Sequence, residues 1–378
     1  MVPLDAPQYS PRDVGPEPHE PCRDSVRRLR FEAATGEGSP AALSGHGDRL
    51  ALLELHRDTG TLQARLFDVE AGREVGLSEP VRRAAAGDGS AGDEVIVHES
   101  GVDLVSWGAA EVVVGRLDRD GTLLSVDVHA RAGGERSIVR RAALRTAEHG
   151  LLLLTSGDGI VLHVVGGDGS VRGVRVLPSR VEDMVQGSIA AAGDRVVGAL
   201  VLGEASRDVP RFVRFDLDIA AGDVTTTDVW PELPVDRYRT DAATAVYVDE
   251  LDAVAAFAIS DQIGAPSGVE IVWWEPGGAE LAQAALSRLS IEGLGILGLS
   301  GRMPQQTLAL YTGAGWASSS LLVGRVRAPG VVEGAASPLA ADVGLRSGVT
   351  WQWRDGATAI AYASAGTLEV LLACEGTP

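Results

Sequence analysis

Short runs in which apolar and polar residues alternate recur along the whole chain. Val and Leu dominate these runs, and breaks containing Gly or Asp separate them. Alternation with a period of two indicates half-buried β-strands, and almost no segment shows the spacing of an amphipathic helix. The pattern therefore predicts an all-β protein.

One type of apolar run returns at similar intervals. The clearest internal repeat is GDRLALLEL at 47–55 against GDRVVGALVL at 193–202. Related runs begin near Arg49, Glu111, Gly150, Arg195, Ala253, Thr307 and Ala357. Their mean spacing of about 51 residues suits a four-stranded propeller blade better than an immunoglobulin-like domain.

A second, more amphipathic run follows each of the first. These runs begin near Leu62, Leu123, Ile160, Arg211, Val269, Leu321 and Thr367. Several intervening turns contain Asp-Gly pairs, such as Asp120-Gly121, which favour tight hairpins. We interpret the paired runs as strands b and c of successive blades whose strands are lettered a to d from the centre outward.

Runs that fit the two remaining strands of a blade also occur. Those from Val102, Ala242 and Gly348 read as a strands, and those from Val171 and Asp223 read as d strands. No d strand follows the last c strand, so we expect the N-terminal run 25–33 to complete the last blade. That arrangement would close the ring with strands from both ends of the chain.

Across residues 22–374 the chain thus resembles the seven-bladed β-propeller superfamily. The resemblance is architectural, because the Trp-Asp dipeptide of WD40 repeats is missing and the Gly-Gly pairs lack a kelch context. Rings of six or eight blades and an array of β-sandwiches also fit. Residues 1–21 contain many prolines and indicate a Pro-rich flexible leader, and the resemblance implies one propeller domain at 22–374 with a tail at 375–378.

The chain contains enough apolar residues for a large core. Hydrophobic residues make up 45% of its 378 residues. We assign the strand tryptophans to this core, either within a blade or between blades: Trp273, Trp274, Trp351 and Trp353.

The net charge of −19 argues against nucleic acid as a partner, because binding nucleic acid requires clustered cations. No run approaches the ~20 apolar residues of a membrane helix, and the leader has no signal peptide. The absence of Lys and Asn fits a GC-rich bacterial coding sequence.

Two cysteines lie near the ends of the repeat array. Cys22 precedes the N-terminal strand run, and Cys374 ends the last one. If these runs pair antiparallel, the two thiols come close enough for a disulfide, although two separate reduced thiols are the alternative. Because disulfides persist in oxidising compartments, we expect an extracytoplasmic protein, in the periplasm, at the cell surface or secreted.

Candidate binding residues lie on loops of one predicted face. Long b-to-c loops begin at Gly203, Ser260 and Thr312, and a d-to-a loop begins at Trp230 on the same side. Together they carry Trp230, Arg237, Tyr238, Arg239, Arg207, Asp208, Asp261 and Trp316. Aromatic rings beside charged groups suit a glycan or a peptide. Alternatively, the two tryptophans pack onto their own strand ends and loops.

Catalytic and metal motifs are sparse. The seven histidines show no zinc-binding spacing, and no GxSxG nucleophile turn occurs. Asp118 and Asp120 offer two carboxylates for calcium, but the LDRDGT turn lacks the other ligands of an EF-hand loop, so we favour a solvated turn and expect no cofactor.

We therefore predict a non-catalytic exported protein that presents the loop-rich face of blades four to six to a protein or glycan at the cell envelope. One alternative is a propeller hydrolase or lyase that acts on glycans or peptides through Asp208, Asp236 and Asp261. Another is a structural subunit of a larger assembly, which an exposed apolar patch would support.

Overall fold

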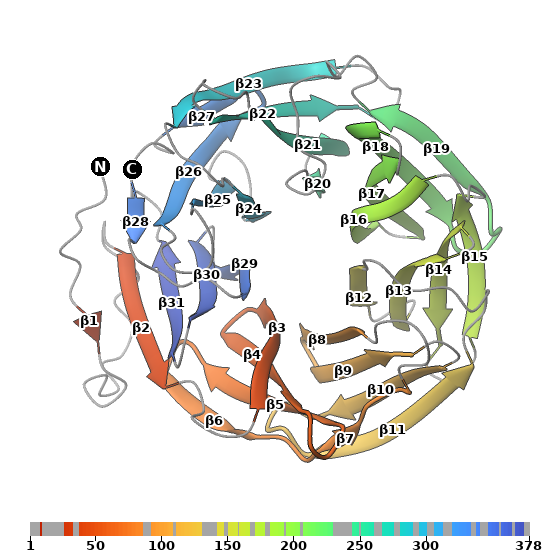
Figure 1. Cartoon of the computed structure of the whole chain (residues 1–378), viewed down its shortest axis with the longest axis vertical. Coiled ribbons are helices and arrows are strands. Elements are labelled where there is room, and N and C mark those ends of the chain that lie inside the picture. The colour runs from red at the N-terminus through yellow and green to blue at the C-terminus, as the bar shows by residue number, and fades with distance from the viewer. Residues whose placement is uncertain are drawn as a thin grey trace.

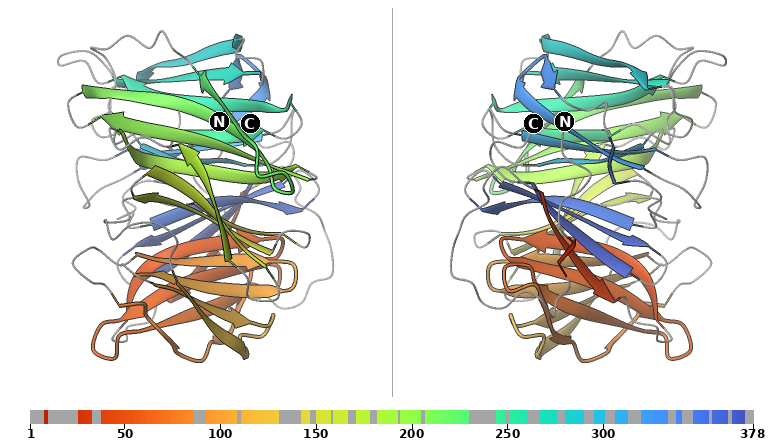
Figure 2. Two further views of the ribbon diagram at one scale, coloured as in Figure 1. Left: turned by 90° about the vertical axis from the view of Figure 1, so that its right-hand side faces the viewer. Right: turned by 90° about the vertical axis from the view of Figure 1, so that its left-hand side faces the viewer.

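The computed structural model is a ring of β-sheets (Figure 1). It describes residues 8–9, 26–32, 38–85, 92–108, 111–130, 142–146, 150–157, 159–166, 171–177, 182–192, 194–204, 207–229, 244–248, 251–260, 267–275, 280–289, 295–300, 306–312, 320–333, 338–340, 347–354, 357–364 and 367–373. The strands of these residues form seven hydrogen-bonded sheets. Figure 2 shows the ring from its sides, with the strands crossing between its two faces. The expected all-β propeller fold is confirmed.

Each sheet is one blade, numbered along the chain. Blade 1 contains β3 (Gly38–His46), β4 (Arg49–His56), β5 (Thr61–Asp68) and β6 (Arg73–Leu77), with β7 (Val81–Arg82) also on β5. Blade 2 contains β8 (Gly92–His98), β9 (Gly101–Trp107), β10 (Glu111–Leu117) and β11 (Leu123–Ala130). Blade 3 contains β12 (Ala142–Thr146), β13 (Gly150–Gly157), β14 (Gly159–Val165) and β15 (Val171–Leu177). Blade 4 contains β16 (Glu182–Ala192), β17 (Arg195–Glu204), β18 (Arg207–Asp218) and β19 (Val224–Val229).

The other blades follow the same order from strand a to strand d. Blade 5 contains β20 (Thr244–Val248), β21 (Ala253–Ser260), β22 (Ser267–Trp274) and β23 (Glu280–Leu289). Blade 6 contains β24 (Gly295–Ser300), β25 (Gln306–Thr312), β26 (Ser320–Ala328) and β27 (Val331–Glu333), with β28 (Pro338–Ala340) also on β26. Blade 7 contains β29 (Ser347–Arg354), β30 (Ala357–Ser364), β31 (Thr367–Ala373), β2 (Val26–Glu32) and β1 (Gln8–Tyr9).

The innermost strands hold neighbouring blades together around the ring. β3 contacts β8 and β29, and each further a strand contacts the a strands of the blades before and after it. Because the blades are antiparallel sheets, their a–b and c–d turns share one face of the ring, and their b–c and d–a connections share the other. We call these the a–b face and the b–c face.

The N-terminal strand completes blade 7, as the sequence predicts. β2 pairs antiparallel with β31 from Val26 opposite Ala373 to Glu32 opposite Thr367. Leu29 and Phe31 of β2 are buried against apolar residues of the last blade and of blade 1. The ring is therefore closed by strands from opposite ends of the chain. Cys22 and Cys374 lie outside the described residues.

Apolar packing between blades explains why the b strands read as continuous apolar runs. A b strand has a neighbouring blade on both faces, so all four leucines of Leu151–Leu154 in β13 are fully buried. The core clusters span adjacent blades; one joins Trp107 of blade 2 to leucines of blade 3, and another joins Val201 of blade 4 to Trp274 of blade 5.

The strand tryptophans lie in the core as predicted. Trp273 and Trp274 are buried, and Trp351 is packed between blades 7 and 1 with Trp353 beside it. The indole Nε1 of Trp351 donates a hydrogen bond to the carbonyl oxygen of Gly47 at 2.9 Å. A Cβ atom at Gly45 would lie 2.3 Å from the Trp351 ring, so this contact requires glycine.

The strand assignment predicted for blade 2 is wrong by one position. The runs from Val102, Glu111 and Leu123 are strands b, c and d, whereas we expect a, b and c from the sequence. The a strand is β8, which pairs with β9. It begins within a Gly- and Asp-rich segment, and those residues indicate a loop when burial is unknown. The Asp93 carboxylate of β8 nevertheless accepts hydrogen bonds from Ser106 and Arg83.

The packing of β2 allows a test of ring closure. Replacing Phe31 by Ala should lower the free energy of unfolding by about 3 to 4 kcal/mol, because the buried ring leaves a cavity. The neighbouring exposed residue provides a control, since Arg30→Ala should change stability by less than about 0.5 kcal/mol. Denaturant unfolding followed by intrinsic fluorescence measures both; equal unfolding midpoints for the two variants would contradict the packing of β2.

Candidate functional site

Most of the predicted binding residues lie outside the described part of the chain. These are Trp230, Arg237, Tyr238, Arg239, Asp261 and Trp316, together with Asp236 of the alternative acid set. Arg207 and Asp208 begin β18, and Arg207 pairs with Glu204 of β17. The b–c loop of blade 4 is therefore shorter than predicted, because the hairpin strands continue through a bulge. The strand ends Ser260, Ser267, Thr312 and Ser320 agree with the loops predicted in blades 5 and 6.

A pocket that the sequence does not predict lies between blades 1 and 2 on the a–b face. Its volume is about 220 Å³. It is lined by His46, Gly47, Asp48, Arg49, Leu50, Leu66, Val97, His98, Glu99, Gly101, Val102 and Arg119. The apolar lining includes Leu50, Leu66 and Val102, which are nearly fully buried, and the polar lining carries charges of both signs.

Three turns bring the polar lining together. The a–b turn of blade 1 supplies His46 to Arg49, with Gly47 at a φ of 53°. The a–b turn of blade 2 supplies His98 and Glu99, and the c–d turn of blade 2 supplies Arg119. A Cβ atom at Gly101 would lie 2.1 Å from the Leu117 carbonyl oxygen, so glycine lets these two turns of blade 2 approach each other.

Two arginines cross-link these turns through backbone carbonyls. Arg49 Nη1 donates a hydrogen bond to the carbonyl oxygen of Arg119 at 2.9 Å, and Arg119 Nε donates one to the carbonyl oxygen of Glu99 at 2.7 Å. Neither guanidinium forms an ion pair with a carboxylate among the residues that the structure describes. A guanidinium carries five N–H donors, of which these bonds use one in each arginine.

The turn of blade 2 also holds a histidine between a hydroxyl and a carboxylate. Ser100 Oγ lies 3.0 Å from His98 Nδ1, and Asp103 Oδ2 lies 3.6 Å from His98 Nε2. The second distance is too long for a hydrogen bond, and Ser100 is only two residues from His98. The three residues thus lie within one hairpin of blade 2, with a hydrogen bond only between Ser100 and His98.

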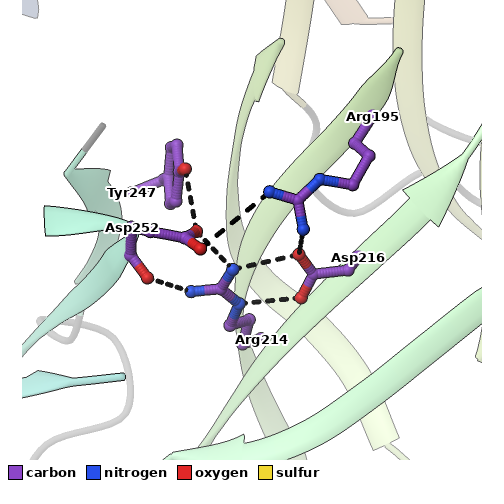
Figure 3. A network of polar contacts seen from close by, with 5 residues as sticks. All are labelled: Arg195, Arg214, Asp216, Tyr247 and Asp252. Atoms are coloured by element: carbon purple, nitrogen blue, oxygen red, sulfur yellow. Dashed lines mark hydrogen bonds and ion pairs between the residues drawn. The ribbon is translucent and has the colours of Figure 1, made fainter. Parts of the chain in front are cut away.

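The equivalent position between blades 4 and 5 holds an ionic network (Figure 3). Arg214 of β18 is fully buried, and its Nε and Nη2 donate to the two carboxylate oxygens of Asp216 at 2.7 and 2.9 Å. From blade 5, Asp252 accepts from Arg214 through its carbonyl oxygen at 2.5 Å and through Oδ1 at 2.7 Å. Tyr247 donates to the same Oδ1 at 3.0 Å, and Arg195 lies 3.5 Å from Asp216.

The internal repeat shows how the side chains at the two junctions differ. Strand pairing sets Arg49 opposite Asp68 in blade 1 and Arg195 opposite Asp218 in blade 4. Counting back along the c strands, blade 1 has Leu66 and Ala64 where blade 4 has Asp216 and Arg214. Blade 1 thus has two apolar residues where blade 4 has an ion pair, and Leu66 lines the pocket.

Asp118 and Asp120 belong to the c–d turn of blade 2. Asp118 Oδ1 accepts hydrogen bonds from the backbone N–H groups of Asp120 and Thr122, both at 2.9 Å. The hydrogen bond from Thr122 contributes most to lowering the pKa of the Asp118 carboxyl, and the bond from Asp120 adds to it. Within the described ranges no group of three or more His, Cys, Asp or Glu side chains is placed to hold a metal ion. No described segment forms a helix that is long and apolar enough to span a membrane.

Comparison with known proteins places the chain in the β-propeller fold class. No family model and no curated protein sequence matches it. The WD40 domain of Toxoplasma gondii coronin superposes with a TM-score of 0.53 at 10% identity, covering 93% of this chain and 87% of that one. The Dos1 propeller has a TM-score of 0.52 at 9% identity, covering 92% and 95%. Kuenenia stuttgartiensis hydrazine synthase has a TM-score of 0.53 at 14% identity, covering 92% and 99%. At these identities the likeness establishes the fold alone.

The ionic network predicts a pH dependence of stability. Burial raises the pKa of Asp252, but hydrogen bonds from Arg214 and Tyr247 outweigh it, so the pKa lies below its usual 3.8. A carboxylate with a lowered folded-state pKa stabilises the fold above its unfolded pKa, and this contribution is lost as pH falls through the folded value. Asp252→Asn should cost about 1 to 2 kcal/mol at neutral pH, since solvent screens this partly exposed group.

The difference in unfolding free energy between wild type and Asp252→Asn should shrink as the pH falls below 3.8. Urea unfolding at several pH values measures it. Asp228→Asn is the control, because its ion pair with Arg211 is half exposed and should contribute little at any pH. A difference that stays constant down to acid pH would contradict the role of the Asp252 carboxylate.

Proposed function

We propose that the protein is a non-catalytic binding propeller that holds a polar group of a protein or glycan partner in the pocket between blades 1 and 2. The pocket volume carries this proposal. At about 220 Å³ it is smaller than the roughly 300 to 1,000 Å³ of pockets that enclose whole small molecules. A pocket of this size suits one side chain or one sugar unit that projects from a larger ligand.

The chemistry of the lining supports a polar, hydrogen-bonding group. Arg49 and Arg119 are oriented by their bonds to carbonyl oxygens, so they lose little further freedom when a ligand binds. Their guanidinium groups suit a carboxylate or the hydroxyls of a sugar. Asp48 and Glu99 supply acceptors for ligand hydroxyl or amino groups.

A second contact surface on the opposite face would make the ring a scaffold. The connections Ser260 to Ser267 and Thr312 to Ser320 leave the b–c ends of blades 5 and 6, whereas the pocket lies on the a–b face. We assign the partner-binding role on the b–c face to Trp230, Arg237, Tyr238, Arg239, Arg207, Asp208, Asp261 and Trp316. Two contact faces on one rigid ring suit a protein that holds two partners together.

A binding screen tests the pocket. Arrays of glycans and of acidic and neutral peptides are the probes, and affinities for the hits are measured by calorimetry. Arg119→Ala should weaken binding about tenfold or more, because a charge-assisted hydrogen bond is lost. Arg57→Ala is the matched control, since this exposed arginine lies in the b–c turn of blade 1 on the other face.

Two results would contradict the proposal. The first is that wild-type protein binds none of the probes. The second is that Arg119→Ala and Arg57→Ala have the same affinity for every hit. Arg207→Ala tests the b–c face in the same assay, and it should affect only ligands that bind there.

We also propose that the protein works outside the cytoplasm, at the bacterial cell envelope, with Cys22 and Cys374 joined in a disulfide. The pairing of Val26 with Ala373 supports this, because these residues lie four and one positions along the chain from the two cysteines. A covalent link there would secure the strand that closes the ring.

Thiol titration tests the disulfide. Purified unreduced protein should show no free thiol with Ellman's reagent in denaturant and two after reduction. Reduction should also lower the melting temperature, because the unfolded chain loses a constraint across almost its whole length. Two reactive thiols before reduction would rule the disulfide out, and the proposed location would lose its main support.

A further inference from the structure

The outermost strand of blade 2 exposes an apolar stripe. Leu124, Val126 and Val128 of β11 are 65%, 41% and 49% exposed, and they alternate with partly or fully buried residues. Their side chains therefore lie on one face of the strand, and Ala130 continues the row. Among the side chains whose burial the structure describes, only Leu77, Leu281 and Val331 are also large, hydrophobic and exposed, and each lies on a different strand.

Three other outer strands carry charge or cover at their edges. β15 exposes Arg172 and Arg175, and Asp228 on β19 pairs with Arg211. The edge of β2 is covered by β1, whose Gln8 pairs with Arg28 in parallel. Charged side chains and added strands are the usual protection against edge-to-edge association. The exposed face of β11 carries no charged side chain.

The free edge of β11 is accessible. β11 is the terminal strand of its sheet, and no described strand pairs with its outer side. Figure 1 shows it at the outer rim of the ring. Its outward N–H and C=O groups are therefore available for an added strand, in the way that β2 accepts β1.

We propose that β11 pairs antiparallel with β11 of a second copy of this chain, about a two-fold axis at Val126. The stripe is self-complementary in this register. Val126 lies opposite its counterpart, and Leu124 of each copy lies opposite Val128 of the other, with the side chains on the same face. Directly opposite apolar pairs stabilise antiparallel strands, and a patch that matches itself is what a two-fold dimer requires.

Area and charge define how strong this dimer is. One pair of eight-residue strands buries less than the roughly 1,200 Å² of a stable interface, so association is weak and reversible. Each copy carries a net charge of −19, and repulsion between copies opposes association at low ionic strength. Added salt screens this repulsion and should strengthen the dimer, whereas it would weaken a dimer held by ion pairs.

Sedimentation equilibrium tests the pairing. The average mass of wild-type protein should rise from monomer toward dimer between about 5 and 500 μM, with a dissociation constant that falls at least threefold when the salt rises from about 0.05 to 0.5 M. Val126→Arg should weaken association tenfold or more, because the two-fold axis brings the two arginines together. Thr226→Arg is the control, with the same charge change at an exposed site on outer strand β19.

Three outcomes would overturn the proposal. Wild-type protein that stays monomeric at both salt concentrations rules out the dimer. A dimer that persists in both Val126→Arg and the second variant Leu124→Ser uses another surface. Wild-type protein that stays monomeric but binds a peptide with the sequence of residues 122–130 shows that the edge accepts a free strand and not a second ring. Circular dichroism confirms that each variant is folded.

Discussion

The pairing of β2 with β31 is the contact on which the rest of the structure depends. Without it the array of blades would end in an open edge, and the last blade would lose the strand that carries Leu29 and Phe31 into the junction with blade 1. That junction also holds Trp351, whose indole is bonded to the turn at Gly47. The same turn forms one wall of the pocket, so ring closure and the candidate site are physically connected.

The junction of blades 4 and 5 and that of blades 1 and 2 have the same strand arrangement but different side chains. Between blades 4 and 5 the fully buried Arg214 donates to the carboxylates of Asp216 and Asp252, and these bonds offset the cost of burying its charge. The Asp252 carboxylate also accepts from the Tyr247 hydroxyl. At the corresponding places of blade 1, the apolar Ala64 and Leu66 need no such partners, and Leu66 lines the pocket. Two positions of one strand thus carry an ion pair at one junction and apolar side chains at the other.

The sequence is a good guide to the fold and a poor guide to the site. The blade period, the buried b strands and the N-terminal strand β2 of the last blade can be predicted from the alternation and spacing of apolar residues. Both patterns reflect which residues are buried. β8 is not predicted because it begins among Gly and Asp residues, which are typical of loops, and the sequence alone does not show that they are buried. The pocket is missed because it joins residues near 47, 99 and 119, which no motif spacing connects. The Gly-Asp-Arg sequence that begins at Gly47 and again at Gly193 is the sequence feature that points to this turn. Strand pairing then shows that different c-strand residues lie beside the two copies.

The proposed dimer has a geometric consequence for the proposed scaffold. Antiparallel pairing of two β11 strands turns one ring over relative to the other, because the strands cross from face to face. Each side of the dimer would then present the a–b face of one copy and the b–c face of the other. A pocket of one copy and a loop-rich surface of the other would then face the same side of the assembly. The pair would hold two partners on one side, whereas a single ring would hold them on opposite faces.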